Sequence, residues 1–221
     1  ATSLDESELR QQISCEFTPL ERRPMLIPDS GTFSEMSREV RTEIAQLVSQ
    51  VSVDSVLFFI QSLQDFQTRY ALADNRLAVA TWIRDQFQRF GISNAHLQPF
   101  TWNNTTQYNV IATIEGSEIS DEYVIVGGHH DSITNTTPFD LAPGADDNAS
   151  GSTAALEIAR VLMANNYQPK TSIRFVTFAA EEFGLWGSKH YAQDALDNAQ
   201  KIRLMINHDM ISYVADPETK P

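Results

Sequence analysis

The chain has 221 residues, of which 42% are hydrophobic and 20% charged, so it can form one globular domain with a sizeable core. Its 29 Asp and Glu residues against 16 Lys and Arg give a formal net charge of −13, which argues against binding to nucleic acid or to an anionic membrane. With one cysteine, Cys15, no disulfide can form within the chain, and no apolar run approaches the roughly 20 residues of a membrane span.

Residues 1–36 are polar and without a clear period, and several prolines and a glycine interrupt them. We therefore expect an N-terminal extension or a propeptide remnant there. The chain does not begin with methionine, and from this we expect a processed protein that is secreted or periplasmic.

From about residue 40 the apolar residues recur at three- and four-residue spacing, which is typical of helices that bury one face. Asp54 and Asn75 are the expected N-caps of the second and third helices, and Gly91 is expected to end the third. The buried face of the third helix is expected to hold Leu77, Ala80, Ile83, Phe87 and Phe90. These predicted helices cover residues 40–51, 54–66 and 76–90.

After residue 95 the period changes to two, which predicts strands at 96–102 and 108–114, joined by a polar turn. A continuous apolar run at 123–126 is expected of a strand that is covered on both faces. The remaining elements are a helix at 151–165, a strand at 173–180, a helix at 188–199 and a strand at 202–206. This alternation predicts an α/β fold, a three-layer sandwich with helices on both faces of a mixed, mostly parallel sheet.

Four polar segments lie at strand ends or in the loops that follow them, where open α/β sheets place their active sites. In the first, an extended backbone puts His129 and Asp131 on one face and turns His130 to the other. A carboxylate behind a zinc-binding imidazole commonly fixes its tautomer, so His129 is a candidate ligand and Asp131 its partner. An ordinary structural hydrogen bond is the alternative reading of this histidine.

The second segment holds two adjacent aspartates, Asp146 and Asp147, among small residues that lead into a helix. A carboxylate in such a loop can bridge two cations, and small neighbours let a metal and a substrate approach the backbone. Aspartate and asparagine are also common helix caps, and Asn148 or Ser150 could serve in that way.

The third segment holds Glu181 and Glu182 at the end of an apolar strand, where carboxylates are costly to desolvate without a positive partner. One could bind a metal while the other acts as general base, or both could be solvated in an exposed loop. In the fourth segment, alternation places Asn207 and Asp209 on one face and His208 on the other.

Together the four segments supply a histidine and several carboxylates, a mixture that suits zinc. The sequence contains no Gly-x-Ser-x-Gly elbow for a serine nucleophile and no glycine-rich phosphate loop.

The motifs Gly-His-x-Asp-Ser, Gly-Ala-Asp-Asp-x-x-Ser-Gly, Glu-Glu-x-Gly-Leu-x-Gly-Ser and Asn-x-Asp-Met, in this order, resemble those of metallopeptidase family twenty-eight. That family holds di-zinc leucyl-type aminopeptidases and the related glutaminyl cyclases. The similarity covers roughly residues 40–213. It implies a zinc exopeptidase-like fold for 37–221, with peptide or protein N-termini as substrates.

The resemblance also implies which residues bind zinc. His129 and Asp209 would hold the first ion and Glu182 the second, with Asp146 bridging the two. Asp147 would follow Asp146 across a cis peptide bond.

The same resemblance implies the catalytic roles. Glu181 would be the general base, taking a proton from the water between the metals and passing it to the leaving amine. Asp131 would orient His129.

One feature departs from the family. Its second zinc takes a last histidine from a later loop, and no histidine follows Asp209 here. The first zinc site is therefore expected to be complete, and the second to hold only Asp146 and Glu182. We expect a catalytic domain that is incomplete at its C-terminal end, with activity only once the missing segment is restored. A glutaminyl-cyclase-like acyltransferase with one zinc and a non-catalytic binding domain of the same fold are the alternatives.

Overall fold

The structure is a computed structural model that describes residues 38–213. The predicted extension at 1–36, with Cys15, lies outside the described residues. By its internal contacts the chain divides into two compact units, 1–44 and 45–221. The first contributes only the start of helix α2 to the described residues, and every other element belongs to the second.

The predicted order of helices and strands is present, with bounds that differ by a few residues. The helices are α2 (Arg38–Val48), α3 (Val53–Gln64), α4 (Arg76–Arg89), α5 (Gly151–Ala164) and α6 (Trp186–Asp197). The strands are β1 (His96–Trp102), β2 (Thr105–Ile114), β3 (Ile119–His129), β4 (Thr171–Phe178) and β5 (Lys201–Asn207). An irregular helical turn, η2 (Ala145–Ser150), leads into α5.

The five strands form one mixed sheet in the order β1-β2-β4-β3-β5. β2 is antiparallel to both of its neighbours, whereas β3 is parallel to both β4 and β5. Four strands therefore run in one direction and only β2 runs in the other, which confirms the predicted mixed, mostly parallel sheet.

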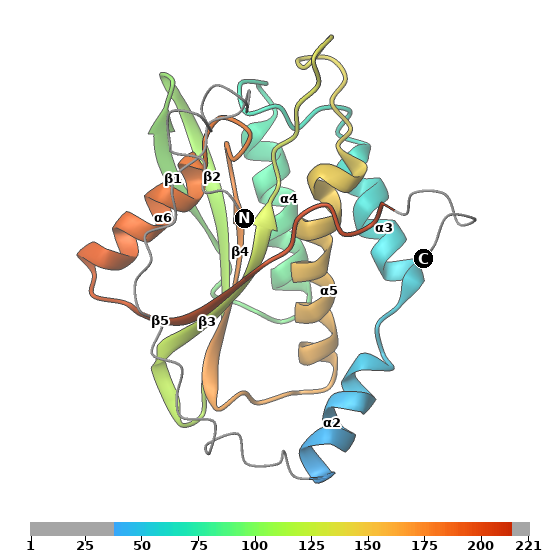
Figure 1. The fold of residues 1–221 in the computed structure, drawn as a ribbon, viewed down its shortest axis with the longest axis vertical. Helices are drawn as coiled ribbons and strands as arrows, with labels where there is room; N and C mark the ends of the chain where they lie inside the picture. The colour runs from blue at the N-terminus through green and yellow to red at the C-terminus, as the bar shows by residue number, and fades with distance from the viewer. Residues whose placement is uncertain (1–37, 214–221) are drawn as a thin grey trace, which may run out of the picture. The chain divides into compact units, whose positions relative to one another are not determined.

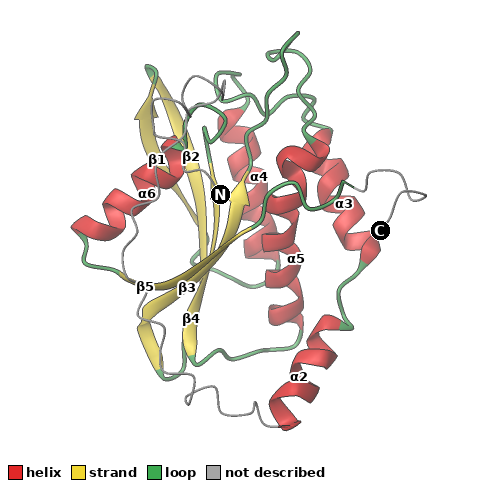
Figure 2. Cartoon of the chain, viewed as in Figure 1, coloured by secondary structure: helices red, strands yellow, loops and turns green. Residues whose placement is uncertain are grey.

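Helices cover both faces of the sheet, as Figures 1 and 2 show, with α3, α4 and α5 on one face and α6 on the other. The alternation of side chains along β2 explains this arrangement. Val110 and Ala112 join the larger core under α3, α4 and α5. Ile111 points the other way and packs in a smaller core with Tyr191 of α6. The predicted three-layer sandwich is confirmed.

Of the two predicted N-caps, Asp54 is wrong, and Asn75 is right in position but makes no capping hydrogen bond with its side chain. The N-cap of α3 is Ser52, whose side chain accepts a hydrogen bond from the backbone N of Ser55 at 3.2 Å, while Asp54 lies inside the first turn. Asn75 occupies the N-cap position of α4, but its side-chain amide donates to the backbone oxygen of Thr68 at 2.8 Å. The Asn75 side chain therefore bonds to the segment before the helix instead of capping the helix.

The buried face of α4 is also rotated slightly from the predicted one. Leu77 is 49% exposed, whereas Val79, Ala80, Ile83 and Phe87 are buried. The hairpin between β1 and β2 is tighter than predicted, because Asn103 and Asn104 alone form the turn with φ angles of 48° and 58°. Two left-handed residues suit the twist of a tight hairpin, and asparagine tolerates that conformation well.

No single helix in the described part of the chain is both long and apolar enough to cross a membrane. The segments 42–48 and 53–64 reach that composition only when they are counted together across a bend. α3, which holds most of this pair, buries Phe59 and Leu63 in the core.

Candidate metal centre

The candidate site lies at the edge of the sheet where β3, β4 and β5 end. These three strands are parallel neighbours, so their carboxyl ends meet at the same edge, as Figure 1 shows. His129 is the last residue of β3, and Asp209 follows β5 by two residues. Glu181 and Glu182 come in the bend after β4. These three strand ends therefore bring His129, Glu181, Glu182 and Asp209 to one edge of the sheet.

His129 is the centre of this group and is 3% exposed. Its Nε2 atom lies 3.2 Å from Asp147 Oδ1, 3.6 Å from Glu181 Oε2 and 3.7 Å from Asp209 Oδ1. One imidazole nitrogen thus faces carboxylates from three other segments. Ligand atoms of His129, Asp147 and Glu182 lie within 4.8 Å of one another, which makes them a compact group of metal donors.

Asp131 supports the group from behind. Its Oδ1 lies 3.4 Å from Nδ1 of His129, and the same nitrogen lies 3.1 Å from the backbone oxygen of Asp131. Its two carboxylate oxygens also accept hydrogen bonds from the backbone N–H groups of Glu181 at 3.0 Å and Glu182 at 3.2 Å. One buried carboxylate therefore fixes the histidine and the bend that carries both glutamates.

The second segment differs from the prediction by one residue. Asp147, and not Asp146, lies beside His129, and the cis peptide bond joins Asp147 to Asn148. Asp146 Oδ1 instead accepts hydrogen bonds from the backbone N and the hydroxyl of Ser212, both at 2.9 Å. The predicted cis bond between Asp146 and Asp147 is wrong.

The reason for this shift lies in the backbone of the loop. Gly144 has a left-handed φ of 46°, and Asp147 and Asn148 have non-helical φ and ψ angles inside an otherwise helical turn. Adjacent side chains in such a loop follow neither strand nor helix periodicity. The sequence pattern therefore could not tell which of the two aspartates turns toward the histidine.

Negative charge dominates the electrostatics of the site. Burial by itself lowers the pKa of His129, but hydrogen bonds to Asp131 and Asp147 outweigh it and raise that pKa to about 11. Burial, followed by the negative charge of Asp147, raises the pKa of Glu182 to about 7. The metal-free site is therefore short of positive charge.

Two observations show that the residues fit a zinc ion. In a tetrahedral zinc site with bonds of about 2.0–2.2 Å, neighbouring ligand atoms lie about 3.3–3.6 Å apart. The distances from His129 Nε2 to Asp147 and Asp209, 3.2 and 3.7 Å, are close to that spacing. Moreover, Glu182 Oε1 is buried and has no hydrogen-bond partner among the described residues. A buried carboxylate oxygen without a partner is costly, and a cation would satisfy it.

The other three histidines near these motifs do not join the group. His130 is buried on the opposite face of the strand end, and its Nδ1 lies 3.0 Å from the hydroxyl of Thr177. Burial lowers the pKa of His130 to about 4. His190 lies on α6 and stacks on Phe100 with ring centroids 5.0 Å apart. His208 Nδ1 is buried without a hydrogen-bond partner among the described residues.

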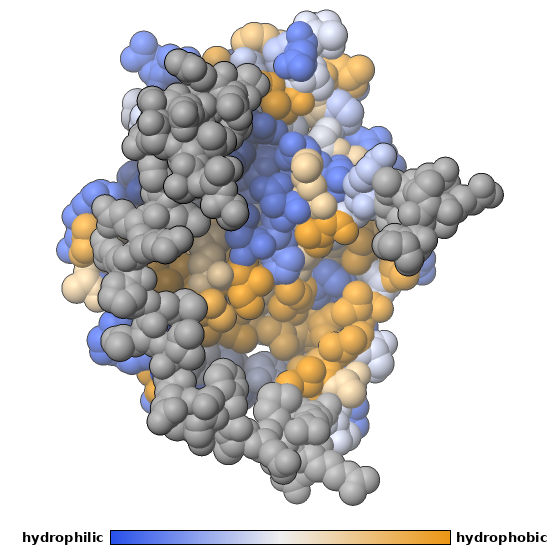
Figure 3. All heavy atoms as spheres, in the orientation of Figure 1, coloured by the Kyte–Doolittle hydropathy of each residue, from blue (hydrophilic) through white to orange (hydrophobic). Residues whose placement is uncertain are grey.

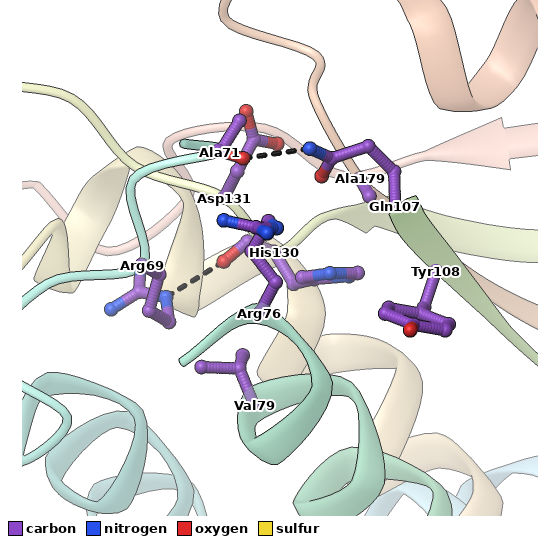
Figure 4. Close-up of a pocket in the computed structure, with 9 residues that line it drawn as sticks. All are labelled: Arg69, Ala71, Arg76, Val79, Gln107, Tyr108, His130, Asp131 and Ala179. Atoms are coloured by element: carbon purple, nitrogen blue, oxygen red, sulfur yellow. Dashed lines mark hydrogen bonds between the residues drawn. The ribbon is translucent and has the colours of Figure 1, made fainter. Parts of the chain in front are cut away.

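Sequence reasoning did not identify two buried residues that tie the site together. The Asn148 amide donates to the backbone oxygen of His208 at 3.0 Å and accepts from the backbone N of Met210 at 3.3 Å, so it holds both sides of Asp209. Arg69, from the segment between α3 and α4, donates to the backbone oxygen of His130 at 2.7 Å (Figure 4). Asn148 stands in a motif in which its residue type suggests only a helix cap, and no motif in the sequence surrounds Arg69.

The sequence matches the family model described as peptidase family M28 over residues 109–218. A probable zinc metalloprotease from Pyrenophora teres f. teres is 34% identical over 204 residues, which cover 81% of this chain and 43% of the relative. A probable leucine aminopeptidase from Arthroderma otae is 31% identical over 215 residues, 93% of this chain and 55% of the relative. The chain thus spans about half the length of the curated relatives that it matches.

Solved structures agree. LapB from Legionella pneumophila superposes with a TM-score of 0.70 at 28% identity, over 80% of this chain and 48% of that one. A glutaminyl cyclase from Bacteroides thetaiotaomicron shares the fold, with a TM-score of 0.60 at 21% identity, over 73% of this chain and 63% of that one. From its motifs, its sheet and these matches, the chain belongs to peptidase family M28, a family of hydrolases whose members matched here are named zinc metalloproteases and leucine aminopeptidases.

Proposed function

We propose that the protein is a zinc aminopeptidase that removes the N-terminal residue from peptides, with Glu181 as general base. One observation carries this proposal. A single buried imidazole nitrogen of His129 faces Asp147, Glu181 and Asp209, at 3.2 to 3.7 Å.

The proposal assigns each ligand. His129 and Asp209 would hold one zinc ion, Glu182 would serve a second metal position, and Asp147 would serve both. Asp147 replaces Asp146 in this role, because Asp146 is engaged with Ser212. No second histidine joins the donor group in the described residues, so we propose that the first position fills before the second.

When bound, zinc supplies Lewis acidity, which polarises the scissile carbonyl and makes water a competent nucleophile near neutral pH. The position of Glu181 supports its role as the base, since its carboxylate lies 3.6 Å from His129 Nε2 and its side chain is 28% exposed. Burial raises the pKa of Glu181, which helps this carboxylate hold the proton until the leaving amine takes it. Asp131 keeps both Glu181 and His129 in place.

The charge of the site supports exopeptidase action. Carboxylates outnumber the one histidine, and the chain has a formal net charge of −13. A free α-ammonium group is attracted to such a site, whereas an acylated N-terminus carries no charge. We therefore propose that substrates bind with a free N-terminus.

The test is zinc content per chain by elemental analysis after mild dialysis, on the wild type and on two neighbouring variants. We expect about one zinc, lost in Asp147→Ala and retained in Asp146→Ala, because only Asp147 faces the histidine. Absence of zinc from the wild type contradicts the metal site. Loss of zinc in Asp146→Ala alone restores the assignment that the sequence suggested.

The reaction is tested separately, by incubating the protein with peptide substrates. Release of leucine from a leucyl peptide, but not from its N-acetylated form, is the expected result. Conversion of an N-terminal glutamine to pyroglutamate without release of an amino acid identifies an acyltransferase instead. Zinc retention with neither reaction identifies a non-catalytic binding domain.

A further inference from the structure

Arg69 ties together the two loops that carry His129 and Asp147. It is 3% exposed and lies in the segment between α3 and α4. Its guanidinium donates to the backbone oxygen of His130 through Nε at 2.7 Å, as Figure 4 shows. It also donates to the backbone oxygens of Pro143 at 2.6 Å and Gly144 at 2.8 Å. A fourth bond, of 3.1 Å, goes to the oxygen of Leu63 at the end of α3.

These acceptors have a common position relative to the site. The carbonyl of His130 lies between the candidate ligand His129 and its partner Asp131. The carbonyls of Pro143 and Gly144 precede Asp147 by four and three residues. The planar guanidinium of Arg69 thus links the loop that follows His129 to the loop that leads to Asp147.

The backbone of Arg69 repeats the same tie. Its N–H donates to the hydroxyl of Ser132 at 3.2 Å, and its carbonyl accepts from the N–H of Ser132 at 3.2 Å. The Ser132 hydroxyl in turn donates to the backbone oxygen of Ala142 at 2.6 Å. The segment around Arg69 therefore contacts both loops through main chain and side chain.

The cost of burying this cation argues for a specific role. All four guanidinium hydrogen bonds go to carbonyl groups, and no carboxylate lies within ion-pair distance of Arg69 in the described part of the chain. Burial lowers the pKa of Arg69 to about 10, and the negative charges of Asp131, Asp147 and Glu182 oppose that shift. Arg69 thus stays charged at neutral pH. It is attracted by the carboxylates of the site without forming an ion pair with any of them.

We propose that Arg69 is a positioning residue for the metal centre, which fixes the spacing between His129 and Asp147 by holding both loops through their carbonyl groups. The proposal rests on the proposed zinc site. A lysine cannot replace Arg69, since one ammonium group cannot reach carbonyls that lie in several directions.

The test measures metal binding rather than activity. Arg69→Lys keeps the charge and loses the forked guanidinium. Arg84→Lys is the matched control, because Arg84 pairs with its half-exposed neighbour Asp85. We expect the zinc affinity of folded Arg69→Lys to fall about 10- to 100-fold, the usual effect of losing a group that orients metal ligands. The absorption bands of bound Co²⁺ should shift in the same variant. Arg84→Lys should match the wild type in both measurements.

Zinc affinity within twofold of the wild type, with unchanged Co²⁺ bands, overturns the proposal. If Arg69→Lys does not fold, Arg69→Gln decides, because its uncharged amide costs less to bury and cannot reach the carbonyl groups of both loops. An affinity several-fold below that of the wild type supports the proposal, and an unchanged affinity overturns it. A wild type that binds no zinc refutes the proposed function itself, whereas a zinc-binding wild type with unaffected variants refutes only the role of Arg69.

Discussion

The carboxylates at the metal centre repel one another when no cation is bound, and a bound cation would remove that repulsion. Glu182 has a buried oxygen without a partner among the described residues, and its pKa is raised to about 7 by burial and by Asp147. The negative charge of Asp131 is partly satisfied, because its carboxylate accepts hydrogen bonds from two backbone N–H groups. Such a site keeps its metal ligands close together before the metal binds, and this lowers the stability of the metal-free chain.

That cost has a defined pH dependence. The folded pKa of Glu182, about 7, lies above its ordinary value of 4.5, so its protonated form is favoured on folding and stability falls as pH rises between these values. The folded pKa of His129, about 11, lies above 6.5, so its contribution is present below pH 6.5 and is lost as pH rises toward 11. Glu182 and His129 therefore both make the folded metal-free protein less stable as pH rises.

We therefore predict that the thermal midpoint of the metal-free protein falls as pH is raised from about 5 to 8, by about 2–4 °C for each kcal/mol lost. Glu182→Gln should flatten this profile and raise the midpoint at pH 8, although the variant loses zinc affinity. Calorimetry in the presence of a chelator measures both effects, with Glu118→Gln, an exposed partner of Lys170, as control. A flat wild-type profile, or a Glu182→Gln variant that is less stable at pH 8, contradicts the prediction.

At the scale of elements, the site depends on how closely the start of α5 approaches the segment after β5. A Cβ atom on Gly151 would collide with the backbone oxygen of His208 and with the side chain of Asn148. The same Asn148 side chain accepts the backbone N–H of Gly151 at 2.9 Å. The small residues of the second motif thus let two elements meet and bring Asp209 toward His129.

Gly151→Ala is accordingly expected to push these elements apart. We predict a loss of stability of about 1–3 kcal/mol from overpacking and a zinc affinity at least tenfold lower. Urea unfolding and competition with a chelator measure the two quantities. Ala164→Gly, at the exposed far end of the same helix, should lower stability by at most about 1 kcal/mol and leave zinc affinity unchanged. Wild-type affinity in Gly151→Ala would show that Asp209 does not depend on this contact.

At the scale of the whole molecule, the described part of the chain has an exposed apolar edge. Ile202, Leu204, Met205 and Ile206 of β5 are 38 to 53% exposed, and β5 is the last strand of the sheet among residues 38–213. Figure 3 shows hydrophobic surface gathered across the part of this face that β5 crosses in Figure 1. The basic residues of the strand do not protect the edge fully, since Lys201 and Arg203 pair with Asp121 and Glu122 of β3. An unpaired apolar edge strand is a template for association.

We predict that the 221-residue chain self-associates at micromolar concentrations and that Leu204→Lys reduces this association. Light scattering during size-exclusion chromatography, over a range of concentrations, measures the average mass. Val48→Lys is the control, because Val48 is 64% exposed but lies on a helix. A wild type that stays monomeric throughout the range excludes β5 as an association edge. Secretion, which was expected from the sequence, stays a prediction.

Much of the fold could be read from periodicity. Apolar residues at helical and strand spacing predicted the order of elements and the mixed sheet, because burial of one face requires that spacing in any tertiary context. Alternation also placed His129 and Asp131 correctly on one face and His130 on the other, since these residues directly end a strand. Motif order was enough to predict the family.

Elsewhere, long-range contacts made the choice. Asp146 and Asp147 are equivalent in the sequence, and only the loop backbone, held by Arg69 and Ser212, turns Asp147 toward the histidine. Asn75 has the chemistry of a cap, yet a carbonyl 7 residues away takes its side chain. Local pattern predicts which faces are buried, because that depends on spacing along one element. The choice between neighbouring polar side chains depends on partners from distant segments, which become neighbours only when the chain has folded.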